Sequence, residues 1–145
     1  MKNFFKKTLP LILCLVLCAA MTILATGCGV KKSEGPYSTK IYKSGTIGKG
    51  ATSFNLDVVN AEGKTVNLKV KTDETTVGAA LLKLEVIAGD DSEYGLYVKC
   101  VNGDVADYDK DQSYWAFYIN GEYAMSGVDS TTIEADATYT LKVEK

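Results

Sequence analysis

Alternation of apolar and polar side chains runs through much of the chain after residue 53. Residues 54–59 (FNLDVV) and 65–71 (TVNLKVK) alternate on either side of a turn-rich stretch, which predicts a β-hairpin. Residues 94–101 and 113–119 predict two further strands, and an Asn-Gly turn follows the second. Residues 131–134 and 139–144 predict short closing strands.

One stretch between these strands has helical spacing instead. Its apolar residues fall at i, i+3, i+4, i+7 and i+11, which predicts a helix that ends near Gly89: Val77, Ala80, Leu81, Leu84 and Ala88. The order is then β-β-α-β-β followed by short strands. A single helix across one face of a mixed sheet would bury one apolar set and give an α+β domain: Leu56, Leu68, Leu81, Leu84, Phe117 and Leu141.

The N-terminus has the pattern of a secretory leader. Lys2, Lys6 and Lys7 precede an apolar run over residues 9–20, and small residues lead to Cys28. The Gly-Cys ending resembles the bacterial lipobox, in which the chain is cut before the cysteine and the cysteine is acylated. We therefore expect a lipoprotein signal peptide at residues 1–27 and a lipid-anchored, extracytoplasmic protein on the cell membrane. An ordinary signal peptide or an uncleaved membrane helix is the alternative.

Residues 28–52 are rich in Gly, Ser, Thr and Lys, which favours a flexible tether between the lipid and a domain at residues 53–145. Tyr37, Ile41 and Tyr42 leave open a short strand that packs on the domain.

Composition narrows the function. Cleavage before Cys28 would leave thirteen lysines and eighteen acidic residues, a formal charge of −5, which disfavours nucleic acid as a partner. The chain contains no His and no Arg, which removes Ser-His and Cys-His nucleophile pairs and His-ligated metals. No cofactor is indicated, and we expect no enzyme. Cys14 and Cys18 would leave with the leader, so Cys100 has no partner for a disulfide and is predicted to be a small buried side chain on the face of Leu96 and Val98.

The strand at residues 113–119 is unusual because both of its faces are apolar or aromatic. Either Trp115 faces the core and the tyrosine face is open, or the reverse. With neighbouring tyrosines, an exposed aromatic surface would suit a flat amphipathic ligand, a glycan or a protein partner, and its candidate residues are Tyr97, Tyr114, Trp115, Tyr118 and Tyr123. The alternative is that these side chains only complete a sheet surface.

Asp107, Asp109 and Asp111 repeat at every second position, as at the start of an EF-hand calcium loop. Gln112 stands where that loop needs Gly, and Tyr118 where it needs Glu. The segment is therefore either a noncanonical Ca²⁺ site or a solvated acidic loop without a bound ion.

Three separated segments carry a family resemblance: residues 75–81 (TTVGAAL), 114–122 (YWAFYINGE) and 127–129 (GVD). In this order they resemble the transcobalamin-like C-terminal domain family, DUF4430, over about residues 52–145. The resemblance implies a β-grasp-like sheet with one helix packed on one face, in secreted or lipid-anchored bacterial proteins. It also implies similarity to the smaller domain of the animal cobalamin carriers, so a corrinoid is the ligand that the resemblance suggests.

The leading hypothesis is a lipid-anchored, non-enzymatic module that binds a corrinoid or a related small ligand. The alternative is an interaction module that docks a membrane transporter or another surface protein. A hydrolase would need two carboxylates in an apolar setting, and its candidates lie in predicted loops and turns: Asp104, Asp107, Asp109, Asp111 and Glu122.

Overall fold

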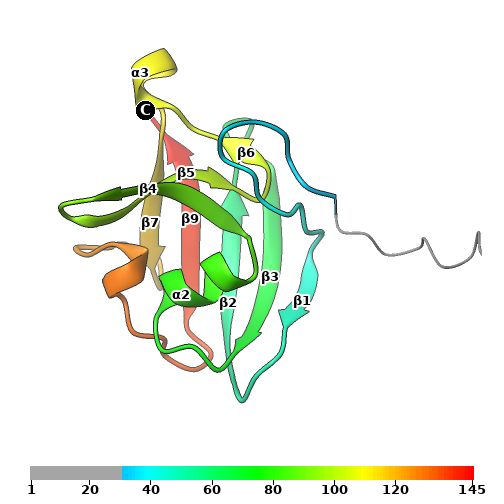
Figure 1. Cartoon of the computed structure of the whole chain (residues 1–145). Helices are drawn as coiled ribbons and strands as arrows, with labels where there is room; N and C mark the ends of the chain where they lie inside the picture. The colour runs from blue at the N-terminus through cyan, green and yellow to red at the C-terminus, as the bar shows by residue number, and fades with distance from the viewer. Residues whose placement is uncertain (1–30) are drawn as a thin grey trace, which may run out of the picture.

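Strands dominate the computed structural model, which describes residues 31–145 (Figure 1). In chain order the elements are β1 (Gly45–Gly48), β2 (Thr52–Val59), β3 (Thr65–Thr72), α2 (Val77–Lys83), β4 (Ile87–Ser92), β5 (Gly95–Val101), β6 (Asp104–Val105), α3 (Tyr108–Asp111), β7 (Tyr114–Ile119), β8 (Glu122–Tyr123), the 3-10 turn η1 (Val128–Ser130) and β9 (Thr138–Glu144). The predicted α+β class is confirmed in its coarse form.

The main sheet has six strands in the order β1-β3-β2-β9-β7-β8. β2 and β3 form the predicted antiparallel hairpin, and β2 runs parallel to β9 at the centre of the sheet. Side chains alternate between the two faces of each strand. One face therefore collects the apolar positions, with Leu56 paired to Leu68 and Phe117 paired to Leu141.

A second layer covers that apolar face. It consists of α2 and the three-stranded sheet β4-β5-β6 (Figure 1). Tyr139 lies at the centre of the core, edge-on to Phe54 and stacked on Phe117. Of the predicted core set all members are buried except Leu84, which is half-buried.

The helix is shorter than its apolar spacing predicts. Helix α2 ends at Lys83, and the predicted last positions, Ala88 and Gly89, belong to strand β4. Glu85 has a left-handed backbone with φ of 56°, which turns the chain out of the helix, and the Val86 N–H bonds to the Leu81 carbonyl. The prediction was wrong here because the apolar spacing continues across this turn.

The closing strand predicted at residues 131–134 is also wrong. Only an isolated bridge joins Thr132 to Thr76, and Ile133 donates its N–H to the Thr75 carbonyl. Residues 131–134 thus contact Thr75 and Thr76 at the start of α2, and the next strand of the main sheet is β9.

The segment expected to be a tether packs on the domain through much of its length. Thr39 is completely buried, and its Oγ1 accepts a hydrogen bond from the Gly103 N–H at 2.7 Å. Tyr42 donates its hydroxyl to the Leu84 carbonyl at 2.7 Å. Further on, β1 pairs in parallel with β3. Residues 37–42 therefore pack on the domain, as the alternative proposed, but they form no strand, because Lys40 makes only an isolated bridge with Lys32.

Cys100 is buried, as predicted, and is the single cysteine among residues 31–145, but its surroundings differ from those predicted. A bulge between Ala88 and Gly89 shifts the pairing of β4 with β5. Val98 and Val101 both join the core as a result, whereas the Cys100 Sγ lies 3.5 Å from Thr39 Oγ1.

The predicted signal peptide and Cys28 lie outside the described residues, so both stay predictions. Within residues 31–145 no helix has the length and apolar character needed to cross a membrane.

Candidate binding site

Strand β7 divides its aromatic side chains between the two faces of the main sheet. Trp115 and Phe117 point into the space between the layers, and Trp115 is only 7% exposed. Tyr114 and Tyr118 lie half-buried on the opposite, open face. The sequence left open which face of this strand is buried. In the structure Trp115 faces the core, and Tyr114 and Tyr118 face outward.

A hollow of about 450 Å³ opens beside Trp115. It lies between the tip of the β4–β5 hairpin and the loop that follows β8. Its walls come from three separate parts of the chain: Tyr94, Trp115, Phe117, Tyr123, Ala124, Met125, Ser126, Gly127 and Ser130.

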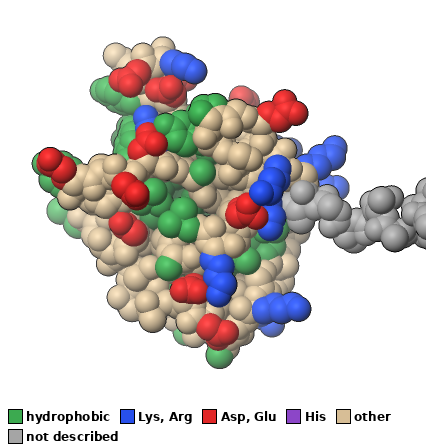
Figure 2. All heavy atoms as spheres, in the orientation of Figure 1, with side chains coloured by type: hydrophobic (Ala, Val, Ile, Leu, Met, Phe, Trp, Pro, Cys, Tyr) green, Lys and Arg blue, Asp and Glu red, His purple; other side chains and the backbone are tan. Residues whose placement is uncertain are grey.

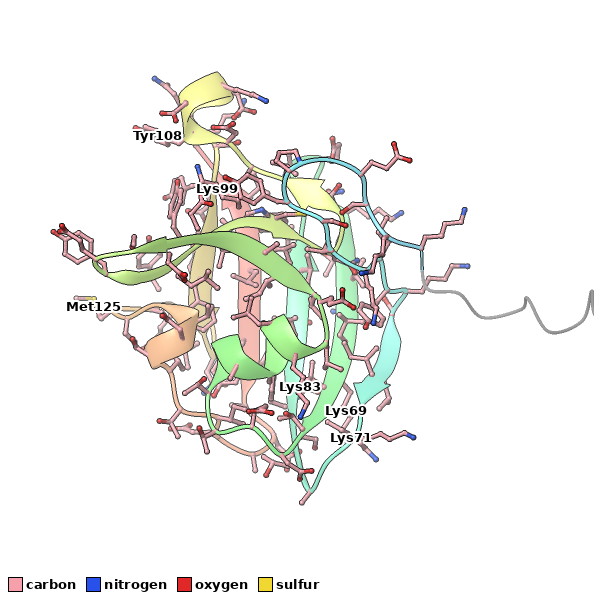
Figure 3. All side chains as sticks on the ribbon, viewed as in Figure 1. Lys69, Lys71, Lys83, Lys99, Tyr108 and Met125 are labelled. Atoms are coloured by element: carbon pink, nitrogen blue, oxygen red, sulfur yellow. The ribbon has the colours of Figure 1, made fainter. Side chains whose placement is uncertain are left out.

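The rim of this hollow carries the most exposed apolar side chains of the described domain. Met125 is 100% exposed, Tyr94 is 90% exposed and Tyr123 is 57% exposed. Figure 2 shows hydrophobic side chains at the side of the molecule where the hairpin tip lies, with acidic side chains around them, and Figure 3 places Met125 there. Large exposed apolar side chains gathered around a concavity indicate a binding surface.

Two buried polar atoms near the hollow have no hydrogen-bond partner in the described part of the chain: the indole Nε1 of Trp115 and Oδ1 of Asp129. An unmet buried donor costs about 1–3 kcal/mol, so a structure retains it only with a compensating reason. An acceptor on a ligand that enters beside Trp115 would supply such a reason.

Asp129 fixes the loop that forms one wall of the hollow. Its Oδ2 accepts the N–H of Leu96 at 3.0 Å, which joins η1 to strand β5. A Cβ at Gly78 would lie 2.7 Å from the Asp129 Cα, and a Cβ at Gly95 would lie 2.5 Å from Oδ2. Glycine is needed at both positions because neighbouring atoms occupy the space of a side chain. Gly78 thus marks the close approach of α2 to η1.

The outer tyrosines form a separate cluster around Glu144. Tyr118 donates its hydroxyl to the Glu144 carboxylate, and the Tyr114 hydroxyl lies 3.5 Å from the same group. The hydrogen bond to Glu144 raises the pKa of Tyr118 to about 12, and burial raises the pKa of Tyr114. Tyr123 contacts Tyr118 edge-on at 5.4 Å between ring centroids. The raised pKa values keep the Tyr114 and Tyr118 hydroxyls protonated at neutral pH, and the Tyr118 hydroxyl is bonded to the Glu144 carboxylate.

The structure therefore separates the five predicted aromatic residues. Tyr114, Tyr118 and Tyr123 meet on the open face, while Trp115 and Tyr123 line the hollow. Tyr97 lies on β5 in the other layer, with the ammonium of Lys99 4.6 Å from its ring centroid.

Sequence reasoning missed Tyr94 and Met125 as wall residues. Tyr94 was predicted to begin a strand but lies in the turn before β5, and Met125 lies in the loop after β8, so neither apolar side chain belongs to a strand or helix. That mismatch is a usable signal, since an apolar residue that does not serve a core often serves contact with a partner.

The predicted calcium ligands do not form a metal site. Asp107 caps the single turn α3 by accepting the Asp109 N–H, and Asp111 accepts from the Ser113 backbone and hydroxyl, which lowers the pKa of Asp111. Within residues 31–145 no group of three or more acidic or Cys side chains could hold an ion. The spacing in the sequence reflects capping rather than ligation.

The carboxylates considered for hydrolysis lie in exposed or half-exposed positions: Asp104, Asp107, Asp109, Asp111 and Glu122. A general acid in a glycosidase needs an apolar setting that raises its pKa. The surroundings of these five groups do not offer that setting.

Comparisons with known proteins extend this description. Residues 74–145 match the family model of DUF4430, a domain of unknown function. The fold is similar to the crystal structure of a candidate metal-binding protein from Ruminococcus gnavus, with a TM-score of 0.63 and 22% identity over 66% of this chain and 98% of that chain. Haptocorrin in complex with Cbi gives a TM-score of 0.49 and 21% identity over 65% of this chain and 25% of that chain. Among curated proteins, none matches the chain.

Proposed function

The chain belongs to the DUF4430 family through residues 74–145, as its motifs predicted, and we propose that it is a non-enzymatic binding module. The module holds a small amphipathic ligand in the hollow beside Trp115. The observation that carries the proposal is the combination of exposed Tyr94 and Met125 with a buried indole N–H that has no partner in the described chain. Apolar walls with a few convergent polar groups are typical of ligand sites.

The transcobalamin-like resemblance makes a corrinoid the first ligand to test. A corrinoid has a broad apolar ring edge and amide side chains, which fits aromatic walls and a donor at Trp115. This choice rests on family analogy, and the hollow itself argues only for a ligand with an apolar surface and a hydrogen-bond acceptor.

The proposal extends to the topology and the location of the domain. The strand order β3-β2-β9-β7, with the parallel pair β2-β9 at its centre, supports a β-grasp-type sheet. In the chain, the separate sheet β4-β5-β6 follows α2 and precedes β7. The leader and Cys28 support an extracytoplasmic, lipid-anchored protein on the cell membrane.

Protein docking is a second candidate because one side of β7 is open. β8 pairs only with Tyr118 and Ile119, so residues 114–116 have a strand neighbour on one side only. Such an edge can accept an extended segment of another protein, such as a transporter component, as an added strand.

Metal binding is not proposed for this chain. The name of the Ruminococcus gnavus protein applies to that protein, and the described residues here bring no metal-ligating cluster together.

Isothermal calorimetry with cobalamin and precursor corrinoids tests the leading proposal, with heme and glycans as comparison ligands. We expect saturable micromolar binding by the full chain in detergent. Combined Tyr94→Ala and Met125→Ala substitution should weaken it at least about tenfold, or about 1.4 kcal/mol. Tyr108→Ala is the matched control, because Tyr108 is exposed on α3 away from the hollow. Equal affinity in the two variants would place the ligand elsewhere, and no heat with any ligand would favour protein docking.

A further inference from the structure

The charge of the domain is divided between the two ends of the main sheet. Residues 31–85 contain nine lysines and six acidic residues, whereas residues 86–145 contain four lysines and twelve acidic residues. The first part builds β1, β3 and α2, and the second part builds β7, β8 and the β4–β5 hairpin. In Figure 2 most blue side chains accordingly lie on the β1 side, and most red ones lie toward the hairpin or at the top.

Several lysines of the β1–β3 edge are not neutralised by a neighbour. Lys32 and Lys40 share Glu85, and Lys83 pairs with Glu74. For the remaining lysines of this part, the described residues offer no carboxylate within 4.0 Å: Lys31, Lys43, Lys49, Lys64, Lys69 and Lys71.

Two of these lysines stand on strand β3 itself. Lys69 and Lys71 are two positions apart and share the open face of the main sheet. Figure 3 shows both close to β1, with Lys83 on the neighbouring α2. Strand geometry therefore holds positive charges side by side at this end of the sheet.

The chain has little length with which to hold this edge away from a membrane. Packing on the domain begins at Lys31, whose carbonyl accepts the Ile41 N–H, and continues with the bridge between Lys32 and Lys40. An acylated Cys28 would precede Lys31 by three residues, which span at most about 11 Å when fully extended. That reach is close to the Debye length of about 8–10 Å at physiological ionic strength, so charges at this edge would feel the headgroups.

We propose that the β1–β3 edge docks on anionic lipid headgroups and so directs the β7–β8 edge, with its hollow, away from the bilayer. The proposal rests on the lipid anchor included in the proposed function. Lysines near an anionic leaflet each add to membrane attraction, and the acidic end of the domain is repelled. The β1–β3 edge thus binds a lipid surface. In this orientation of the domain, the ligand site stays open to solvent.

Acetylation footprinting of lysines tests this docking in the full chain. The protein is reconstituted into phosphatidylcholine vesicles with and without phosphatidylglycerol, and each lysine is followed by mass spectrometry. Lys49, Lys69 and Lys71 should react roughly threefold more slowly on the anionic vesicles, and high salt should remove the protection. Lys99 and Lys110, which belong to the acidic part, provide internal controls.

Two double variants that each remove two lysines test whether the position of the lysines, and not the net charge of the protein, causes the protection. Lys69→Gln with Lys71→Gln should abolish the protection of Lys49. Lys110→Gln with Lys145→Gln changes the net charge equally and should leave that protection intact. Equal acetylation on both kinds of vesicle, or protection by a soluble polyanion without protection by anionic vesicles, would overturn the proposal.

Flotation keeps the failure of the anchor distinct from the failure of docking. A lipidated chain floats with phosphatidylcholine vesicles alone. A chain that floats only with anionic vesicles would refute the anchor and support the docking, whereas a chain that floats with neither would refute both.

Discussion

The two ends of the main sheet differ in how the last long strand, β3 at one end and β7 at the other, is covered by a further strand. At one end β1 pairs with residues 68–71, four of the eight residues of β3, and the N-terminal segment and several lysines lie nearby. At the other end β8 covers only two residues of β7, and aromatic side chains and a hollow lie beside the uncovered part. One end is thus covered by a further strand and carries lysines, and the other carries the hollow in which we propose that a ligand binds.

The difference also has a structural cause. Before the first end, hydrogen bonds made by polar residues hold the N-terminal segment to the turn between β5 and β6, as in Thr39 with Gly103 and Tyr42 with Asn102. The other end depends on a loop held by Asp129 against Leu96, with glycines where the loop meets α2 and β5.

The largest effect is expected from Gly78→Ala, which disturbs only the ligand-binding end. In an exposed helix this change stabilises by about 1 kcal/mol. Here the new Cβ would meet the Asp129 backbone, so we expect a loss of about 2 kcal/mol in the free energy of unfolding and weaker ligand binding. Urea denaturation measures the sign. A gain in stability would show that α2 and η1 are not in the described contact.

Ligand affinity should respond to the hollow and not to the outer tyrosines. Tyr114→Phe combined with Tyr118→Phe removes both hydroxyls near Glu144 but keeps the rings over the sheet. We expect corrinoid affinity within about twofold of the unmodified chain, below about 0.5 kcal/mol. Calorimetry checks this, and a tenfold loss would move the binding site to the open sheet face.

Glu85→Gln should loosen the N-terminal segment without affecting the hollow. Hydrogen bonds from Lys32 and Lys40 lower the pKa of Glu85 to about 2. Since this folded-state pKa lies below the unfolded value, the stabilisation is present above about pH 4.5 and is lost as pH falls toward 2. Amide hydrogen exchange over residues 32–41 should be about two- to fivefold faster in the variant at pH 7. The two chains should converge in acid, and a difference that persists at pH 2 would contradict this role.

The smallest effect concerns Tyr118 at high pH. Its pKa of about 12 lies above the ordinary tyrosine value of about 10, because its hydroxyl donates a hydrogen bond to Glu144. This stabilisation is present below pH 10 and declines as pH rises toward 12. Ultraviolet titration should show a tyrosine that ionises with a pKa of about 12 and is missing in Tyr118→Phe. A full titration by pH 11 would exclude the hydrogen bond.

Local pattern was sufficient for much of the sheet. The hairpin, the β7 strand with its Asn-Gly turn and the burial of Cys100 follow from alternation and turn chemistry. The end of α2 did not follow, since the left-handed Glu85 interrupts a helical spacing that continues in the sequence. The sequence left the packing of the N-terminal segment open, because Thr39 is buried through hydrogen bonds and not through an alternating apolar pattern.

The candidate site could be predicted only in part. Trp115 and Tyr123 lie within the aromatic motif and its turn, and the sequence points to them. The hollow itself arises where the β4–β5 turn and the loop after β8 meet β7, three segments whose approach is a tertiary property. Asp129 sets that approach through a single backbone contact, which no periodicity encodes.

The central claim is that ligand enters beside Trp115, and fluorescence tests it most directly because the chain contains one tryptophan. The full chain is titrated with a corrinoid that binds by calorimetry, and the emission is corrected for absorption by the ligand. The account predicts a saturable change in Trp115 emission with the calorimetric affinity, which is weakened by Met125→Ala and unchanged by Tyr108→Ala. Calorimetric binding with no change in Trp115 emission would contradict it.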